Sequence, residues 1–282
     1  MSLESAVGPA VTKCGDSEFK WGSRTYIMGI INLSPDSFSG DGLKTADAAM
    51  AQAEEFIREG VDVIDVGGES TRPDSKPVSP EEEMDRIVPF IRRLAKITKI
   101  PISVDSYKTG VARSALDVGA CMINDISSLK EEPGLAGLAA ERGVPIILTS
   151  NERGRQVDDI MAAVRDNLRR LIEKTVKAGV SRENIIIDPG IGFGKTVQQN
   201  LEIMRRLEEF RALGRPLLIG TSRKSVIGAV LDLPVEQRLE GTAATVAICI
   251  SRGADIVRVH DVRQMKLVCK MSDAVVRGNF KG

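Results

Sequence analysis

The sequence predicts an α/β protein folded as one closed (β/α)8 barrel, the TIM-barrel architecture. Eight short apolar runs rich in Val and Ile lie along its 282 residues, and most intervening segments carry apolar residues three and four positions apart, as amphipathic helices do. Eight strands alternating with helices over about 260 residues match the usual length of such a barrel. A doubly wound open sheet is the alternative, because the number of strands does not prove closure.

Each expected strand is an apolar run without clear alternation, the pattern of a strand buried on both faces. The runs cover residues 26–31, 62–66, 101–104, 121–124, 144–148, 184–187, 216–219 and 255–259. Before the first run, residues 18–25 predict a β-hairpin that turns at Gly22 and Ser23 and closes the bottom of the barrel, where Phe19 and Trp21 pack. Residues 1–17 are expected to form an N-terminal tail. Residues 18–282 are expected to be a single domain, since no linker or low-complexity stretch divides them.

The expected helices have recognisable starts and ends. Ser79 is the predicted cap of a helix that begins with Pro80, and Glu82 stands three residues after that cap. Helices that precede strands are expected to stop at a glycine, at Gly60, Gly119, Gly143, Gly179 and Gly253.

The composition excludes several classes of protein. Because 39 basic residues balance 39 acidic ones, nucleic acid is a poor default partner. No apolar run approaches the roughly 18 residues of a membrane span, and the polar start lacks the core of a secretory signal, so a soluble, cytoplasmic protein is expected. Four cysteines far apart, with no CxxC pair, and a single histidine exclude a disulfide scaffold and a structural zinc site.

Polar residues follow nearly every expected strand, on the face where barrels of this kind carry their chemistry. They include Asn32, Asp105, Asn124, Asp188, Lys224, Arg258 and the lone His260. A single polar strand end is most often a cap or turn residue, but so many together indicate a polar ligand, because buried polar groups are costly unless paired. The acids and the amide suit a ligand rich in N–H donors, such as an aminopyrimidine edge. The basic residues follow the last two strands, where barrels often hold phosphate.

Two further features have competing interpretations. Residues 189–196 resemble a phosphate-binding P-loop, but Pro189 stands where the motif requires its first glycine, so the motif is rejected. The loops over residues 33–42 and 67–80 are long for this fold and are either lids that close over substrate or ordinary surface loops.

Long motifs at these strand ends resemble the dihydropteroate synthase family. They are IMGIINLSPDSFSGDG, VIDVGGESTRPDS, ISVDSYK, MINDISSL, DPGIGFGKTVQQNLE, LLIGTSRKSVIG, RLEGTAATVA and IVRVHDV, which together span residues 27–262. The resemblance implies a transferase of folate biosynthesis that joins 6-hydroxymethyl-7,8-dihydropterin pyrophosphate to 4-aminobenzoate. The products are 7,8-dihydropteroate and pyrophosphate, and the implied cofactor is Mg²⁺. In the family the C–O bond is thought to break early, leaving a pterin cation that buried carboxylates stabilise.

The resemblance also implies roles for individual residues. The pterin ring would be held by Asp105, Asn124, Asp188 and Lys224, with Phe193 bordering its pocket. Asn32 would help to bind Mg²⁺, and the pyrophosphate would meet Thr71, Arg72, Arg258 and His260. Phe38, Pro73, Lys224 and Ser225 would shape the aminobenzoate site, which Asp36 would join when the first loop closes. Asp36, Lys224 and Asp188 are the expected catalytic residues.

The chain departs from the family's pattern after the fifth strand. A Met-His-Met-type segment is usual there, whereas residues 148–154 read LTSNERG. One side of the pterin pocket is therefore expected to be lined differently.

Two other functions compete with the synthase. A methyltetrahydrofolate:corrinoid methyltransferase would share the acids and amides but would need no pyrophosphate clamp. A catalytically degenerate pterin-binding paralogue would explain the altered fifth strand end. The family is typically a homodimer, and the last two helices are the expected interface. Their apolar residues, Ala243, Val246, Ile250, Met265 and Val268, either form that interface or face the barrel.

Overall fold

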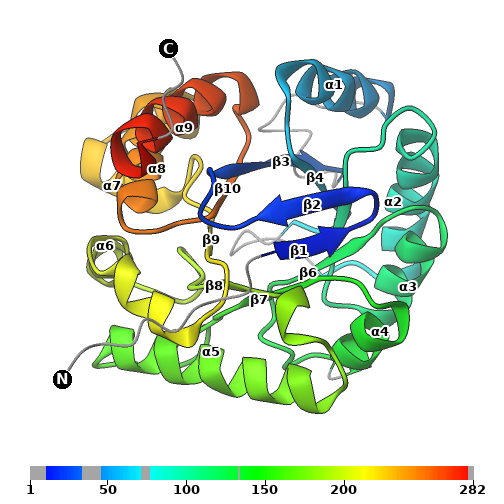
Figure 1. The fold of residues 1–282 in the computed structure, drawn as a ribbon, viewed down its shortest axis with the longest axis horizontal. Coiled ribbons are helices and arrows are strands. Elements are labelled where there is room, and N and C mark those ends of the chain that lie inside the picture. Colours follow the sequence, from blue (N-terminus) through cyan, green and yellow to red (C-terminus); the bar gives the residue numbers. More distant parts are fainter. Residues whose placement is uncertain (1–10, 34–45, 71–76, 133, 279–282) are drawn as a thin grey trace.

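Eight parallel strands form a barrel surrounded by helices in the computed structural model, which describes residues 11–33, 46–70, 77–132 and 134–278 (Figure 1). The strands are β3 Tyr26–Asn32, β4 Val63–Gly67, β5 Ile102–Asp105, β6 Met122–Asp125, β7 Ile146–Thr149, β8 Ile185–Asp188, β9 Leu218–Ile219 and β10 Ile256–Val259. Their order in the sheet is β8-β7-β6-β5-β4-β3-β10-β9, so the first barrel strand pairs with the last. A parallel bridge between Ile187 and Leu217 joins the two ends of the sheet. The predicted closed barrel is confirmed and the open-sheet alternative is wrong.

Each predicted run coincides with an observed strand to within two residues. Several strands run one residue further than predicted and take in the polar residue at their end, as at Asn32, Asp105 and Asp188. The parallel ladder continues through these residues, pairing Asn32 with Gly67 and Gly67 with Asp105. The polar side chains are therefore fixed by strand backbone rather than by loops.

The N-terminal hairpin lies across one end of the barrel, but not with the predicted turn (Figure 1). It consists of β1 Val11–Cys14 and β2 Ser17–Lys20, which turn at Gly15 and Asp16. The turn predicted at Gly22 and Ser23 instead joins β2 to β3, and β1 lies inside the expected tail of residues 1–17. The short polar strand VTKC carries little apolar signal, which is why periodicity missed it.

The hairpin is held to the barrel by aromatic packing, as predicted. Phe19 stacks on Trp21 with ring centroids 5.5 Å apart and meets the edge of Tyr26 at 5.0 Å. Phe19 and Tyr26 are buried among the side chains that fill the barrel, including Met28, Val63, Met122, Ile147 and Ile186. Since the interior is filled at this end, the fold directs attention to the opposite end, where the strands terminate and barrels of this kind carry their active sites.

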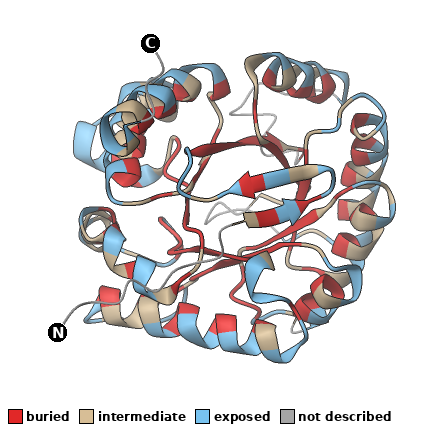
Figure 2. Cartoon of the chain, in the orientation of Figure 1, coloured by how far each residue is buried: buried red, intermediate tan, exposed pale blue. Residues whose placement is uncertain are grey.

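The helices surround the barrel, with their buried faces toward the strands and their outer faces exposed (Figure 2). They are α1 Ala46–Glu59, α2 Pro80–Leu94, α3 Thr109–Asp117, α4 Gly134–Arg142, α5 Ile160–Lys177, α6 Val197–Arg205, α7 Ser225–Leu231, α8 Leu239–Ser251 and α9 Val262–Arg277. The 3-10 segments among the described residues are Arg182–Asn184, Leu207–Leu213 and Val235–Gln237. Across the described part of the chain, no helix has both the length and the apolar character that a membrane crossing requires.

The predicted helix signals are confirmed. Ser79 caps α2, since its side chain accepts a hydrogen bond from the Glu82 backbone N–H at 3.2 Å, and Pro80 is the first residue of the helix. The five predicted stop glycines all have positive φ, a conformation that costs glycine little and other residues much. These local signals place each helix end so that the chain can enter the next strand.

Candidate active site

Polar side chains from five strands converge at the carboxyl end of the barrel. Asp65 and Asp105 come from β4 and β5, Asn124 from β6, Asp188 from β8 and Arg258 from β10. Asp65, Asn124 and Asp188 are buried, whereas Asp105 and Arg258 are partly exposed. We call these five residues the strand-end ring. Four of them were predicted as site residues and Asp65 was not.

Arg258 connects the acids of the ring. Its Nε donates to Asp65 Oδ2 at 2.6 Å and its Nη2 donates to Asp105 Oδ2 at 2.5 Å. Asn124 Nδ2 donates to the same oxygen of Asp65 at 3.1 Å. Acids and bases were expected on different sides of the ligand, but the guanidinium fork reaches two carboxylates at once and lies between them.

Two carboxylate oxygens in the ring have no donor. Asp65 Oδ1 and Asp105 Oδ1 are buried without a hydrogen-bond partner, an arrangement that costs about 1–3 kcal/mol for each group. Burial raises the pKa of Asp105 to about 7; the positive charge of Arg258 opposes this rise and the negative charge of Asp65 adds to it. The ring is therefore arranged to accept hydrogen bonds from a ligand that carries N–H groups.

The loop after β8 adds an aromatic face beside the ring. Asp188 Oδ1 accepts a hydrogen bond from the Gly190 backbone N–H at 2.8 Å, and burial raises the pKa of Asp188. Lys224 Nζ donates to the carbonyl of Ile191 at 2.5 Å and lies 4.8 Å from the centroid of the Phe193 ring. Burial lowers the pKa of Lys224 to about 8, although the charge of Asp188 works in the opposite direction. The structure thus brings Asp188, Phe193 and Lys224 together, as predicted.

The rejected phosphate-loop motif has a structural explanation. The ammonium group of Lys195 donates to three backbone carbonyls, those of Ser150, Gly190 and Phe193, at 2.8, 2.9 and 3.1 Å. The lysine that would contact phosphate in a P-loop therefore holds the loop after β8 against the end of β7.

The atypical segment after β7 forms a buried polar network. Glu152 is fully buried and its carboxylate accepts hydrogen bonds from Ser150 Oγ at 2.8 Å, Asn167 Nδ2 at 3.2 Å and Arg155 Nη1 at 2.7 Å. Its backbone N–H donates to the carbonyl of Phe193 at 3.2 Å. Residues 148–154, which depart from the family's pattern, thus support the loop that carries Phe193 and form an ordered wall of the site.

A strained turn directs Lys224 into the site. Arg223 has φ of 55°, which is uncommon for a residue with a side chain. An ion pair with Asp261, with N–O distances of 2.5 and 3.0 Å, and a hydrogen bond from Arg238 to the Arg223 carbonyl hold this conformation. The next residue, Lys224, precedes α7, and the first residue of that helix, Ser225, is exposed.

The single histidine is positioned by a serine. His260 Nδ1 lies 3.0 Å from Ser222 Oγ, and the His260 backbone N–H donates to that hydroxyl at 3.2 Å. Ser222 follows β9 and His260 follows β10, so the contact joins two adjacent strand ends. This places His260 at the same rim as Arg258, as predicted.

Asn32 flanks the ring next to Asp105. Measured from the position that a Cβ would occupy at Gly67, Asn32 Oδ1 lies at 3.6 Å and Asp105 Cβ at 3.5 Å. The remaining predicted site residues, Asp36, Phe38, Thr71, Arg72 and Pro73, lie outside the described residues, as do most of the two long loops. Among the described residues, no three His, Cys, Asp or Glu side chains are grouped so as to hold a metal ion.

A buried lysine ties together the segments on either side of residues 71–76. Lys108 Nζ donates to Glu69 at 2.5 Å, to Glu83 at 2.6 Å and to the carbonyl of Val78 at 2.7 Å. Its side chain is 7% exposed, so these ionic contacts are shielded from water. The chain that follows β4 is thereby fixed at both of its described ends.

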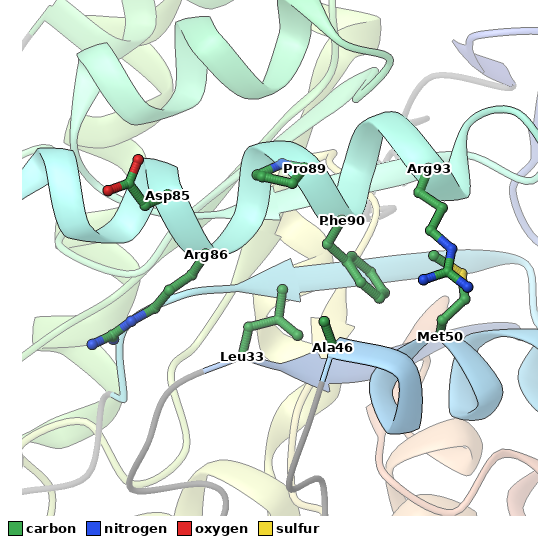
Figure 3. A pocket seen from close by; sticks show the side chains of 8 residues that line it. All are labelled: Leu33, Ala46, Met50, Asp85, Arg86, Pro89, Phe90 and Arg93. Atoms are coloured by element: carbon green, nitrogen blue, oxygen red, sulfur yellow. The ribbon is translucent and has the colours of Figure 1, made fainter.

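A cavity of about 330 Å³ is lined by eight residues, which Figure 3 shows. Its lining residues come from the end of β3, from α1 and from α2: Leu33, Ala46, Met50, Asp85, Arg86, Pro89, Phe90 and Arg93. None of them belongs to the ring. We therefore assign the chemistry to the strand ends and not to this cavity.

Sequence reasoning missed Asp65 and Lys195 as parts of the site. Asp65 stands inside an apolar run, two residues after Val63, whose side chain packs inside the barrel. Because side chains alternate along a strand, the side chain of Asp65 must point into the barrel as that of Val63 does. An acidic residue at an inward-facing strand position is therefore the sequence signal that could have identified Asp65. Lys195 was considered only as a phosphate ligand, and its contacts with backbone carbonyls depend on a fold that the motif does not encode.

Comparison with known proteins shows which family and which proteins this chain is similar to. Residues 28–260 match the family model described as pterin binding enzyme. A dihydropteroate synthase from Clostridium beijerinckii is 49% identical over 267 residues, 94% of this chain and 99% of the relative. The crystal structure of a dihydropteroate synthase from Clostridium difficile in the presence of pteroic acid superposes with a TM-score of 0.88 at 45% identity, covering 92% and 99% of the two chains. The structure of a Xanthomonas albilineans dihydropteroate synthase with 4-aminobenzoic acid superposes with a TM-score of 0.89 at 38% identity. The match covers 94% of this chain and 98% of that one.

Proposed function

This chain belongs to the pterin-binding enzyme family, and from that premise we propose how its strand-end ring carries out its reaction. The reaction is that of dihydropteroate synthase, a transfer step of folate biosynthesis. The methylene carbon of 6-hydroxymethyl-7,8-dihydropterin pyrophosphate loses its diphosphate and gains the amine nitrogen of 4-aminobenzoate. Diphosphate leaves with the bonding electron pair, and the amine loses a proton.

The unpaired carboxylate oxygens of the ring carry the assignment of the pterin site. An aminopyrimidine edge presents adjacent N–H donors, which match Asp188 and the buried Oδ1 atoms of Asp65 and Asp105. Asn124 supplies an amide beside them, and Phe193 supplies an aromatic face. When the C–O bond breaks, positive charge develops on the pterin, and carboxylates held in fixed positions stabilise it without reorganising.

The cationic groups meet the leaving diphosphate. Arg258 has five N–H donors, of which Nε and Nη2 already donate to aspartates, so Nη1 is the donor we assign to a phosphate oxygen. His260 lies at the end of the same strand, held by Ser222. We assign Thr71 and Arg72, which the structure does not describe, to the same group.

Mg²⁺ fits the donor set on the β3 side of the ring. Mg²⁺ usually binds one or two protein oxygens and takes its remaining ligands from water and substrate phosphate, so a three-residue cluster is not required. The amide oxygen of Asn32, beside Asp105, is a donor of that type. When bound, the ion neutralises diphosphate charge and so assists its departure. Asn32 would hold the ion through its amide oxygen.

The aminobenzoate site lies where Ser225 and Lys224 reach the rim. Ser225 is exposed at the start of α7, and the Lys224 ammonium is next to Phe193. A carboxylate placed there meets the Ser225 hydroxyl and the Lys224 ammonium group, both of which can donate hydrogen bonds to it. Phe38, Pro73 and Asp36 complete this site in the proposal.

A direct turnover assay tests the function. Purified protein is mixed with the pterin pyrophosphate, labelled 4-aminobenzoate and Mg²⁺, and labelled dihydropteroate is measured. We expect product formation that stops when EDTA removes the metal. If no product forms but methyltetrahydrofolate donates a methyl group to a corrinoid protein, the methyltransferase alternative is correct. Binding of the pterin pyrophosphate without either reaction would identify a degenerate paralogue.

We also propose that the protein is a homodimer, although not through the residues first expected. Val246, Ile250 and Met265 are buried against the barrel. The outward faces of α8 and α9 instead expose large apolar side chains, namely Ile248, Leu267, Met271, Val275 and Val276. Large apolar side chains exposed on two helices that pack against each other favour association. Sedimentation of the wild type should give twice the chain mass, and Leu267→Glu combined with Met271→Glu should give the monomer.

A cytoplasmic location completes the proposal. All four cysteines are free thiols, including the pair Cys14 and Cys121 that lie in contact, as expected for a protein kept in a reducing compartment. Fractionation of the source cells should find the protein with soluble cytoplasmic markers.

A further inference from the structure

Two cysteines meet at the bottom of the barrel, far from the strand-end ring. Cys14 is the last residue of β1 in the hairpin, and Cys121 directly precedes β6. Their sulfur atoms lie 3.1 Å apart, and Cys14 Sγ also lies 3.1 Å from the carbonyl oxygen of Cys121. Cys14 is buried, whereas Cys121 is partly exposed. Cys121 is therefore the more accessible residue of the pair.

We propose that Cys14 and Cys121 form a reversible disulfide when the protein meets a peroxide, and that this bond locks the hairpin onto the barrel. The Cys121 thiolate attacks one peroxide oxygen and becomes a sulfenic acid, releasing water after protonation. The sulfur of Cys14 then attacks the sulfur of Cys121, forms the S–S bond and displaces a second water. In total, two thiols lose two electrons to one hydrogen peroxide, and two waters are released.

The environment of the pair supports the order of these steps. The hydrogen-bonding contact between the two thiols lowers the pKa of Cys121, whereas the same contact together with burial raises the pKa of Cys14. Since the thiolate is the nucleophile, Cys121 reacts first and Cys14 resolves the sulfenic acid. Cys249 and Cys269 are buried, and burial raises the pKa of both, so these two thiols serve as internal unreactive controls.

The bond should stabilise the fold without affecting turnover. It joins residues 107 positions apart, and closing a loop of that size restricts the unfolded chain. Cys121 lies at the amino end of its strand, whereas Asn124 of the ring lies toward the carboxyl end. The oxidised protein should therefore keep its activity and unfold at a higher temperature.

Peptide mapping tests the proposal. The reduced protein is treated with hydrogen peroxide, alkylated and digested with trypsin. We expect a linked pair of peptides, residues 14–20 joined to residues 114–130, which dithiothreitol separates. The midpoint of thermal unfolding should rise by about 5 °C or more on oxidation and return on reduction. Cys14→Ser and Cys121→Ser should each abolish both effects, and Cys269→Ser should retain both.

Three results would overturn the proposal. Both thiols remaining open to alkylation after peroxide treatment would show that the pair does not react. Oxidation of Cys121 to a sulfinic acid without linkage would show that Cys14 does not resolve it. A linkage between two chains, seen by non-reducing electrophoresis, would place the bond outside the hairpin contact.

Discussion

Replacing Asp65 with alanine removes the carboxylate that anchors the strand-end ring. Asp65 is fully buried on β4, and its Oδ2 accepts hydrogen bonds from Arg258 at 2.6 Å and from Asn124 at 3.1 Å. Asp65→Ala leaves Arg258 with Asp105 as its remaining acid partner in the ring and leaves the Asn124 amide without this acceptor. The variant therefore tests whether Asp65 positions the ring.

The structure sets the size of the expected loss. Removing one partner of a buried ion pair costs about 3–5 kcal/mol, and Arg258 keeps its contact with Asp105, which favours the lower figure. The unpaired amide of Asn124 adds about 1 kcal/mol, and removal of the unpaired Asp65 Oδ1 returns a similar amount. We expect the free energy of unfolding to fall by about 3 kcal/mol. Since Arg258 loses its anchor, kcat/KM should fall at least about tenfold, or 1.4 kcal/mol.

Urea unfolding measures the loss of stability. The single Trp21 reports on the hairpin by fluorescence, and far-UV circular dichroism reports on the helices. Asp65→Asn retains an oxygen acceptor and should fall between the wild type and Asp65→Ala. Glu141→Ala is the matched control, because it removes a carboxylate whose ion pair with Arg113 is exposed to solvent. The control should unfold at the urea concentration of the wild type. An unchanged unfolding midpoint in Asp65→Ala would refute this account of the ring.

Substitutions in and beside the site, and a change of pH, test the roles of its residues. Asp188→Asn and Lys224→Ala should each lower kcat/KM by at least about a hundredfold, while the circular dichroism spectrum stays unchanged. Normal turnover in either variant would contradict the site assignment. Activity should rise as the pH passes through about 7, because Asp105 ionises and can then accept hydrogen bonds from the ligand. Activity should fall above about pH 8, because Lys224 loses its proton. A flat pH profile between 6 and 9 would contradict both assignments. Gly194→Ala should destabilise the protein by at least about 2 kcal/mol, because φ is 68° and the new Cβ would lie 2.2 Å from a backbone nitrogen. Gly137→Ala, in open space on α4, should leave stability unchanged or improved, and equal urea midpoints for the two glycine variants would refute the steric argument.

The periodicity of apolar residues and the local capping residues were sufficient to predict the barrel. Strands buried on both faces need apolar side chains throughout, and a helix packed on one side needs an apolar stripe. Both patterns can therefore be recognised in the amino-acid sequence. The Ser79 cap and the stop at Gly60 are similarly local, since each depends on neighbours within a few residues. The hairpin turn was misplaced because β1 is short, polar and stabilised by contacts with distant parts of the chain.

The order of the strands, the rim at which they end and the polar residues at that rim, including Asp105, Asn124 and Asp188, can all be predicted from the amino-acid pattern. The contacts between those residues depend on how the chain folds in three dimensions. Arg258 crosses to Asp65, 193 positions away, Lys195 binds carbonyls of another loop, and Cys14 meets Cys121. Periodicity indicates that a residue is buried but not which residue it is buried against, whereas a hydrogen bond or thiol contact requires two particular atoms within about 3 Å. That condition is met only when the closed barrel brings distant segments together.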